Sequence, residues 1–99
     1  DDWGHQAKLL APDGAYNDNF GESVAIYQDT IVAGAHLDDD NGVSSGSAHV
    51  FVREGANWNH QAKLVAPDPA VDDWFGLGVD IDNGTALVGS RTSAYVFSD

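Results

Sequence analysis

The sequence predicts an all-β protein made from two copies of one structural unit, and three observations support this prediction. Residues 20–35 (FGESVAIYQDTIVAGA) reappear at 75–90 as FGLGVDIDNGTALVGS. In each copy two β-rich runs flank a two-residue polar connection, at 28–29 or at 83–84, which is the pattern of a β-hairpin. Pro, Gly or Asp interrupts every window that is long enough for a helix. A hairpin that occurs twice indicates a repeat protein.

Two further strand patterns accompany each hairpin. Residues 3–9 (WGHQAKL) alternate in polarity with a period of two, which is typical of a strand, and the pattern returns at 58–64 as WNHQAKL. A third run follows each hairpin, SAHVFVR at 47–53 and SAYVF at 93–97. The period of two places the following residues of the second WxHQAKL run on one face: Trp58, His60, Ala62 and Leu64.

These patterns together predict eight short strands. Four strands in a unit of about 50 residues are the signature of a β-propeller blade. The two copies are offset by 55 residues as far as the polar loop 36–46, and by 46 residues after it, so the second copy lacks nine loop residues. The expected fold is therefore all-β, with two four-stranded antiparallel blades. The expected strands are one at Trp3, three within 20–53, one at Trp58 and three within 75–97.

The repeated segments resemble the FG-GAP repeat. The motif FG…SVAI…VAGA, with QAKL…APD before it and S-A-(H/Y)-V-F after it, is similar to the bacterial type of this repeat. The resemblance occurs twice and covers nearly the whole chain. It implies propeller blades related to those of the integrin α-chain head, a fold used mainly for adhesion and protein contact. The calcium motif of the integrin-like repeats, Asp-x-Asp-x-Asp-Gly before the VxGA strand, is absent, because residues 28–29 and 83–84 occupy that position.

We expect a single module with three parts: an outer strand at 1–12, a first repeat at 13–67, and a second, shortened repeat at 68–99 that lacks its outer strand. Two blades do not close a propeller, since rings contain about four to eight blades. A lone pair of blades also leaves two apolar faces in water. One interpretation is that the chain is a fragment of a longer propeller.

The alternative interpretation, which we favour at this stage, is exchange of a strand between copies. The first WxHQAKL run is spare, and the second sheet lacks a strand of that kind, so a strand from another copy is expected to complete the second blade. Head-to-tail contacts of this type produce a ring or an open fibre. The expected donor residues are Trp3, His5, Ala7 and Leu9, and the expected acceptor residues are Ala94, Tyr95, Val96 and Phe97.

Composition narrows the possible partners. The chain has 16 acidic and four basic residues, a net charge of −12, and such a surface repels nucleic acid and anionic membranes. The absence of Cys excludes disulfides and thiolate metal sites. No apolar run approaches the roughly 20 residues of a membrane span. The resemblance to FG-GAP repeats implies an extracellular or cell-surface protein, and we expect its partners to be copies of itself, another protein or a carbohydrate.

Two positions suggest a bound ion or a modification. The acidic loop Asp38-Asp39-Asp40-Asn41 offers oxygen ligands of the kind that calcium prefers, although no Glu follows at the spacing of an EF-hand. The alternative is a solvated acidic loop. Asn83 begins an Asn-Gly-Thr sequence that fits the N-glycosylation acceptor, although the same Asn-Gly pair is explained by a hairpin turn.

No catalytic motif stands out. The four His residues form no H-E-x-x-H sequence, and the serines of 44–47 lie in no G-x-S-x-G elbow. His5 and His60 occupy equivalent positions in the two copies and are expected to be structural. We predict a non-enzymatic assembly module, with a calcium-assisted ligand-binding or adhesion propeller as the alternative.

Repeat-matched positions are also expected to hold the blades together. Burial of one such apolar side chain contributes about 1.5–3 kcal/mol. Glycines at matched positions are expected where backbones approach closely. The expected cohesive residues are Phe20, Val24, Ile26, Phe51, Phe75, Val79, Ile81 and Phe97, and the expected glycines are Gly21, Gly34, Gly76 and Gly89.

Overall fold

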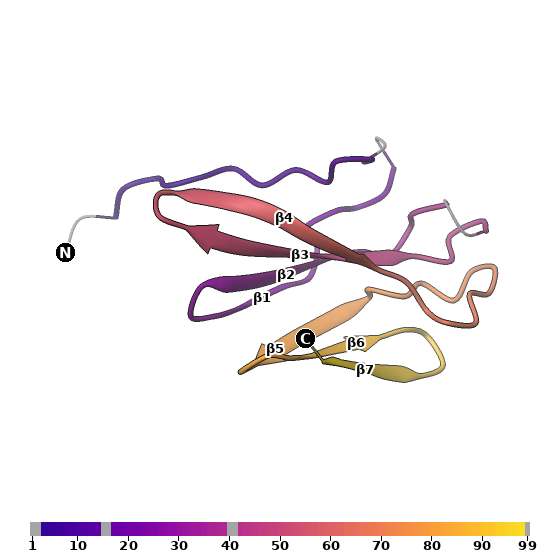
Figure 1. The fold of residues 1–99 in the computed structure, drawn as a ribbon. Helices are drawn as coiled ribbons and strands as arrows, with labels where there is room; N and C mark the ends of the chain where they lie inside the picture. Colours follow the sequence, from indigo (N-terminus) through magenta and orange to yellow (C-terminus); the bar gives the residue numbers. More distant parts are fainter. Residues whose placement is uncertain (1–2, 15–16, 40–41, 99) are drawn as a thin grey trace.

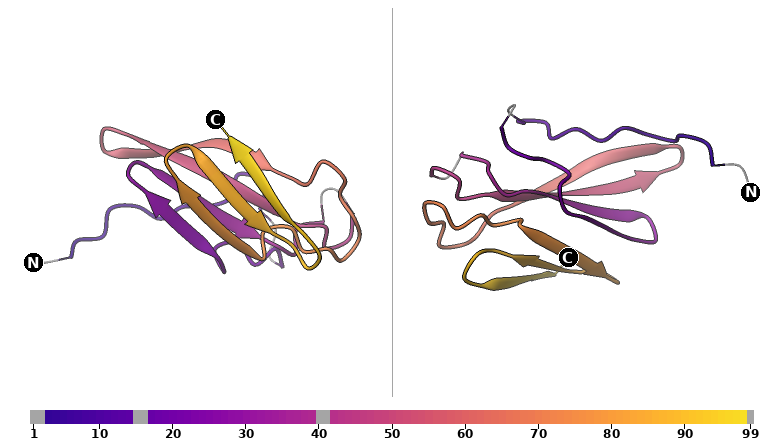
Figure 2. Two further views of the ribbon diagram at one scale, coloured as in Figure 1. Left: turned by 90° about the horizontal axis from the view of Figure 1, so that it is seen from below. Right: turned by 180° about the vertical axis from the view of Figure 1, so that it is seen from behind.

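The chain folds into two antiparallel β-sheets that lie one above the other (Figures 1 and 2). The computed structural model describes residues 3–14, 17–39 and 42–98, and these contain strands but no helix, hence no helix that could cross a membrane. Sheet 1 has the order β1-β2-β3-β4, and sheet 2 has the order β5-β6-β7. The strands are β1 (Val24–Tyr27), β2 (Thr30–Ala35), β3 (Ser47–Glu54), β4 (Asn57–Leu64), β5 (Gly78–Asp82), β6 (Thr85–Gly89) and β7 (Ala94–Ser98).

Both predicted hairpins form, with the predicted turns. β1 pairs with β2 across residues 28–29, and β5 pairs with β6 across residues 83–84. Tight hairpin turns need positive φ, and Asn83 and Gly84 have φ of 46° and 87°. The two repeats of the chain have similar backbone conformations, since φ is positive at three matched pairs of positions: Asn19 and Trp74, Gly21 and Gly76, and Gln28 and Asn83.

The register of sheet 1 defines two faces. Directly paired residues share a face, so Ala25, Val32, Val50 and Ala62 lie in one row. We call this the inner face, because members of the row pack in the core with sheet 2. The opposite, outer face carries two rows: Val24, Ala33, His49 and Lys63, and then Ile26, Ile31, Phe51 and His60.

The core lies between the inner face of sheet 1 and sheet 2. Sheet 2 contributes Ile81, Ala86 and Val88, and Phe75 joins them from the segment before β5; Phe75 and Val88 are completely buried. Each large side chain buried in this way contributes about 1.5–3 kcal/mol to stability. The sheet 1 members of the buried cluster are Val32, Ala48 and Val50, and Ala66 belongs to the connection between the sheets.

The two sheets are also held by backbone contacts at the start of the second repeat. The N–H of Phe75 donates to the carbonyl of Ser45 at 2.8 Å, and Gly46 and Phe75 form a parallel bridge. The hydroxyl of Ser23 donates to the carbonyl of Gly76 at 2.9 Å. A Cβ on Gly46 would overlap the backbone of Phe75. The Phe-Gly pair of the second repeat therefore lies directly against the backbone of sheet 1.

Three sequence-based expectations about burial are wrong in this structure. Val24 and Ile26 are each 62% exposed, because they lie on the outer face of sheet 1 and no second sheet covers them. Phe20 and Phe51 also pack on that face and not between the sheets. A Cβ on Gly89 would have a single neighbour, at 3.8 Å, and a Cβ on Gly21 would have none within 4 Å, so of the four predicted glycines only Gly34 and Gly76 mark close approaches.

The WxHQAKL patterns also differ from expectation. Residues 3–9 form no strand, although their counterparts 58–64 do, because an alternating pattern shows only what a segment is able to form, and a strand also needs backbone pairing with a neighbour. The described chain therefore has seven strands and not eight. The residues of β4 do not share one face either, since a register shift between Val50 and Phe51 leaves His60 on the outer face and Ala62 on the inner face.

Gly34 and Gly89 give a matched test of the close approach, since they are equivalent residues of β2 and β6. A Cβ on Gly34 would overlap the carbonyl oxygen of Gly76, whereas a Cβ on Gly89 meets only ordinary contact. We expect Gly34→Val to lower the free energy of unfolding by more than about 3 kcal/mol, and Gly89→Val to change it little. Urea unfolding followed by tryptophan fluorescence measures both, and equal effects would contradict the packing described here.

Candidate interaction site

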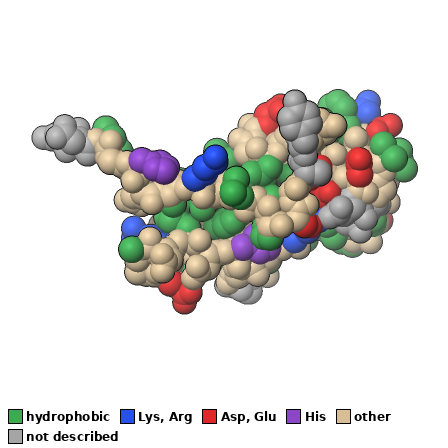
Figure 3. Space-filling model, turned by 90° about the horizontal axis from the view of Figure 1, so that it is seen from above, with side chains coloured by type: hydrophobic (Ala, Val, Ile, Leu, Met, Phe, Trp, Pro, Cys, Tyr) green, Lys and Arg blue, Asp and Glu red, His purple; other side chains and the backbone are tan. Residues whose placement is uncertain are grey.

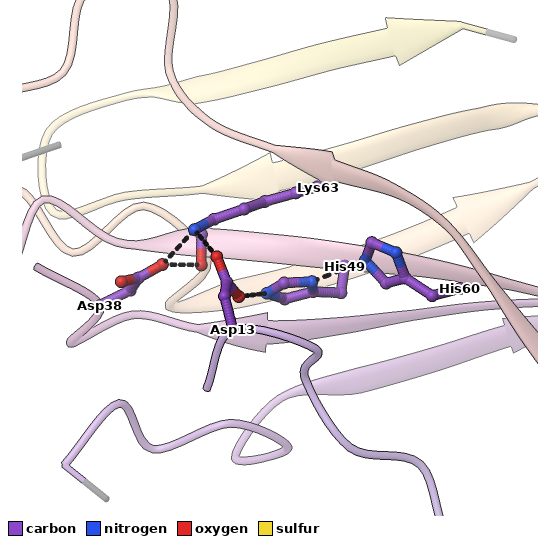
Figure 4. A network of polar contacts seen from close by, with 6 residues as sticks. Asp13, Asp38, His49, His60 and Lys63 are labelled. Atoms are coloured by element: carbon purple, nitrogen blue, oxygen red, sulfur yellow. Dashed lines mark hydrogen bonds and ion pairs between the residues drawn. The ribbon is translucent and has the colours of Figure 1, made fainter. Parts of the chain in front are cut away.

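A polar network lies on the outer face of sheet 1 (Figure 4). The ammonium group of Lys63, on β4, is 2.6 Å from Oδ2 of Asp13 and 3.0 Å from Oδ2 of Asp38. The hydroxyl of Ser47 donates to the same oxygen of Asp38 at 2.7 Å. One lysine thus joins the N-terminal segment and the loop after β2 to the outer strand of sheet 1.

His49 continues this network on β3. Its side chain is 1% exposed, its Nδ1 lies 2.9 Å from Nε2 of His60, and its Nε2 lies 3.9 Å from Oδ1 of Asp13. Burial lowers the pKa of His49 and the neighbouring His60 lowers it further, while Asp13 acts in the opposite direction. The neutral imidazole is therefore favoured at this position.

Phe20 covers the same histidine. Its ring meets that of His49 edge-on with centroids 5.6 Å apart, and that of Phe51 with centroids 6.1 Å apart. Edge-to-face geometry of this kind is favourable for aromatic rings. The phenylalanine of the first Phe-Gly pair is thus fixed against the third strand of its own sheet.

The second repeat contains the same arrangement. Phe75 meets Tyr95 and Phe97 edge-on, with centroids 5.3 and 5.8 Å apart. The hydroxyl of Tyr95 donates to Oδ1 of Asp68 at 3.1 Å, as His49 approaches Asp13 in the first repeat. Partial burial raises the pKa of Tyr95, and the hydrogen bond to Asp68 raises it further, so the hydroxyl keeps its proton.

Apolar side chains are exposed on the outward surfaces of both sheets. Val24 and Ile26 are exposed on the outer face of sheet 1, and Leu87 and Val96 are exposed on sheet 2. On the face seen in Figure 3, hydrophobic side chains gather in a band beside the N-terminal segment. Contiguous apolar surface of this kind is typical of contact sites.

The predicted donor and acceptor residues lie in separate places. The acceptor residues 94–97 belong to β7, which pairs only with β6 and so forms an edge of sheet 2 in the described chain. The donor residues 3–9 run above sheet 1, on the side away from sheet 2 (Figure 1). Trp3 is 100% exposed, His5 and Ala7 are exposed, and Leu9 is partly buried.

The acidic loop is only partly described. Asp40 and Asn41 lie outside the described residues. Asp38 is buried and bonded to Ser47 and Lys63, and Oδ1 of Asp39 accepts a hydrogen bond from the N–H of Ser44 at 2.7 Å. The described residues contain no group of three or more His, Asp or Glu side chains that could hold a metal ion. Calcium binding at this loop stays a prediction.

The predicted glycosylation site and two tryptophans lie at the surface. Asn83 is exposed in the turn between β5 and β6, and its glycosylation stays a prediction. Trp58 and Trp74 each lie beside an arginine guanidinium, with Arg53 5.9 Å and Arg91 5.0 Å from the ring centroids. The exposed faces of these two indoles are therefore partly occupied by cations.

Sequence reasoning missed the central role of Lys63. The residue is unremarkable in a strand pattern, and its partners Asp13 and Asp38 are 50 and 25 positions away. One signal was present, since Lys63 and Asp13 both have counterparts in the other repeat, Lys8 and Asp68. Opposite charges at matched positions of both copies indicate an ion pair across the sheet.

Two stacked antiparallel sheets, built from one repeated unit and joined at a Phe-Gly pair, define a β-sheet repeat protein. The family model of the FG-GAP repeat matches residues 3–51 and 58–97. The chain therefore belongs to the FG-GAP repeat family, as its sequence motifs indicated. Neither a search of curated proteins nor a search of solved structures found a match.

The lowered pKa of His49 predicts a dependence of stability on pH. Because its folded-state pKa lies below the ordinary value of 6.5, the unfolded chain binds the proton more readily. The contribution of His49 to stability is fully present above pH 6.5 and is lost as the pH falls from there through the folded-state pKa. We expect the free energy of unfolding to decrease as the pH falls below the ordinary value of 6.5, by at most about 1.4 kcal/mol for each pH unit.

His49→Tyr is the matched variant, since Tyr95 occupies the equivalent position of β7. Urea unfolding at several pH values should show a weaker decrease for His49→Tyr than for the unchanged protein. The exposed His5 provides a control, and His5→Gln should keep the original pH dependence. An unchanged slope in His49→Tyr would show that other groups cause the effect.

Proposed function

We propose that this chain is a non-enzymatic interaction module of the β-propeller type that associates head to tail with further copies of itself. One observation carries the proposal: each exposed apolar face is the counterpart of a face that is already packed inside the chain. FG-GAP repeats typically occur in extracellular or surface proteins, and the proposed module acts there. Its net charge of −12 keeps such an assembly soluble.

The outer face of sheet 1 corresponds to the packed face of sheet 2. Val24 and Ile26 on β1 occupy the same repeat positions as Val79 and Ile81 on β5. Ile81 is buried in the core and Val79 packs against it, whereas Val24 and Ile26 are exposed. The face of sheet 2 that carries Val79 and Ile81 packs against the inner face of sheet 1. The outer face of sheet 1 has the same apolar pattern, so it is suited to pack against a face like the inner face of sheet 1.

The outward face of sheet 2 corresponds in turn to the inner face of sheet 1. Leu87 and Val96 occupy the positions of Val32 and Val50, which are both buried. The outer face of sheet 1 and the outward face of sheet 2 therefore correspond to the two surfaces that pack together between the sheets of one chain. A copy placed on either side repeats that contact, and the rotation between successive sheets decides between a closed ring and an open filament.

The outward face of sheet 2 departs from its counterpart along β5. Asp80 and Asp82 stand where β1 has Ala25 and Tyr27. Charged side chains are costly to bury without partners. The apolar part of the outward face of sheet 2 is therefore formed by Leu87 on β6 and Val96 on β7.

Ile26 and Ile81 are the matched pair that tests this proposal. Ile26→Ser should weaken association while leaving the free energy of unfolding nearly unchanged, because the side chain is 62% exposed in the single chain. Ile81→Ser should instead lower that free energy by about 2–5 kcal/mol, since it removes a buried side chain from the core. Light scattering over a range of concentrations measures association, and urea unfolding measures stability.

A mass that stays at 10.5 kDa at every concentration would overturn the proposal. Association that is equally strong in the unchanged protein and in Ile26→Ser would exclude the outer face of sheet 1 as the contact.

A further inference from the structure

We propose that residues 3–9 of one copy form the fourth strand of sheet 2 in a second copy, antiparallel to β7 and with a bulge at Gln6. This inference rests on the proposed function and specifies the residues through which the copies join. It follows from the pairing of β3 with β4 in sheet 1, which shows how a WxHQAKL strand binds an SAxVF strand.

The register of sheet 1 transfers directly to sheet 2. β7 is the counterpart of β3, and residues 3–9 are the counterpart of β4. In sheet 1 the pairing skips Gln61, because the register shifts between Val50 and Phe51. Its counterpart is Gln6. The expected pairs between copies are Ala94 with Leu9, Tyr95 with Lys8, Val96 with Ala7, and Phe97 with His5.

Charge supports this register. In sheet 1, Lys63 lies 2.6 Å from Asp13, next to His49. The corresponding residues of the proposed pairing are Lys8 and Asp68, next to Tyr95. Both are exposed in the single chain, and Asp68 already accepts a hydrogen bond from Tyr95. The counterpart of Lys8 is Lys63, which binds a carboxylate in sheet 1. The chain has only four Lys and Arg residues, and one of them is at this position.

Shape supports the same register. A pocket of about 360 Å³ lies between the sheets beside β7, and Phe97, Ala62 and Leu64 contribute to its lining. His60 packs edge-on against Phe51 in sheet 1, with centroids 5.3 Å apart. In the proposed pairing His5 packs in this way against Phe97. The added strand therefore closes the pocket at the free edge of sheet 2.

The donor segment is available for this pairing. It forms no strand within its own chain, and it lies over sheet 1, on the side away from sheet 2 (Figure 1). Trp3 is fully exposed there, which is costly for an indole. An extended segment that pairs with a free sheet edge gains backbone hydrogen bonds, and the edge is no longer open to unspecific pairing.

Disulfide trapping between two single-cysteine proteins tests the register. The chain has no cysteine of its own, and Ala7 and Val96 are both exposed, so Ala7→Cys and Val96→Cys keep the fold. The two proteins are mixed under mild oxidation, and linked pairs are counted after denaturing electrophoresis. The control mixture contains Leu10→Cys with Val96→Cys. We expect at least about tenfold more linked pair from Ala7→Cys than from the control, because disulfides require closely placed Cα atoms.

Charge reversal tests the same contact without a covalent bond. Lys8→Glu should weaken self-association about tenfold, since it replaces an attraction by a repulsion. Mixing Lys8→Glu with Asp68→Lys should restore association, because both contacts that can form between the two different variants then pair opposite charges. Circular dichroism of each variant confirms that the fold is kept.

The outcomes separate this inference from the proposed function. Association without preferential trapping of Ala7→Cys, or without an effect of Lys8→Glu, overturns the strand pairing and leaves contact through the faces. A chain that stays monomeric at every concentration overturns both.

Discussion

The close approach of the Phe75–Gly76 backbone to sheet 1 is the constraint on which the structure depends. It requires glycine at Gly34 and Gly46, because a Cβ at either position would overlap the backbone of the second repeat. The approach places the ring of Phe75 in the core and sets the distance between the two sheets. The apolar side chains of β5 and β6 then meet the inner face of sheet 1.

The polar network on the other side of sheet 1 has a different role. Lys63 lies on β4, the last strand of sheet 1. Its ion pair with Asp13 holds the N-terminal segment to this strand, and its ion pair with Asp38 holds the loop that follows β2. The ion pair with Asp13, whose side chain is 46% exposed, contributes little to stability, whereas loss of the partner of the buried Asp38 would be costly. The ion pair of Asp13 holds the segment that follows the donor residues 3–9 against sheet 1, and so it determines the point from which the donor segment extends. The same network therefore stabilises sheet 1 of one copy and positions residues 3–9 for the proposed pairing with β7 of a second copy.

The sequence predicted the hairpins, their turns and seven strands, because these depend on local patterns. Asn83-Gly84 favours a hairpin turn through its own backbone preferences. Because the sequence is repeated, the pattern of each strand could also be compared between two segments. Residues 3–9 were predicted as a strand because a pattern shows what a segment is able to form. Whether the strand forms depends on an adjacent edge, which local sequence does not contain.

The candidate site was predicted only in part. The donor and acceptor residues were named from the repeat, but the bulge at Gln61 was not, because strict alternation hides an extra residue. The exposure of Val24 and Ile26 was missed for another reason. Their apolar character matches that of Val79 and Ile81, and only the structure shows which of the two faces has a partner. Lys63 was missed because its partners are distant in sequence.

The order of the strands has a consequence for folding. Sheet 1 is a meander in which every strand pairs with its neighbour in sequence, so it closes only short loops. Sheet 2 is local in the same way, but its place in the core depends on the pairing of Phe75 with residues 45–46, about 30 positions earlier. During synthesis the first sheet is complete before the second emerges. We expect sheet 1 to form first and to provide the surface against which sheet 2 packs.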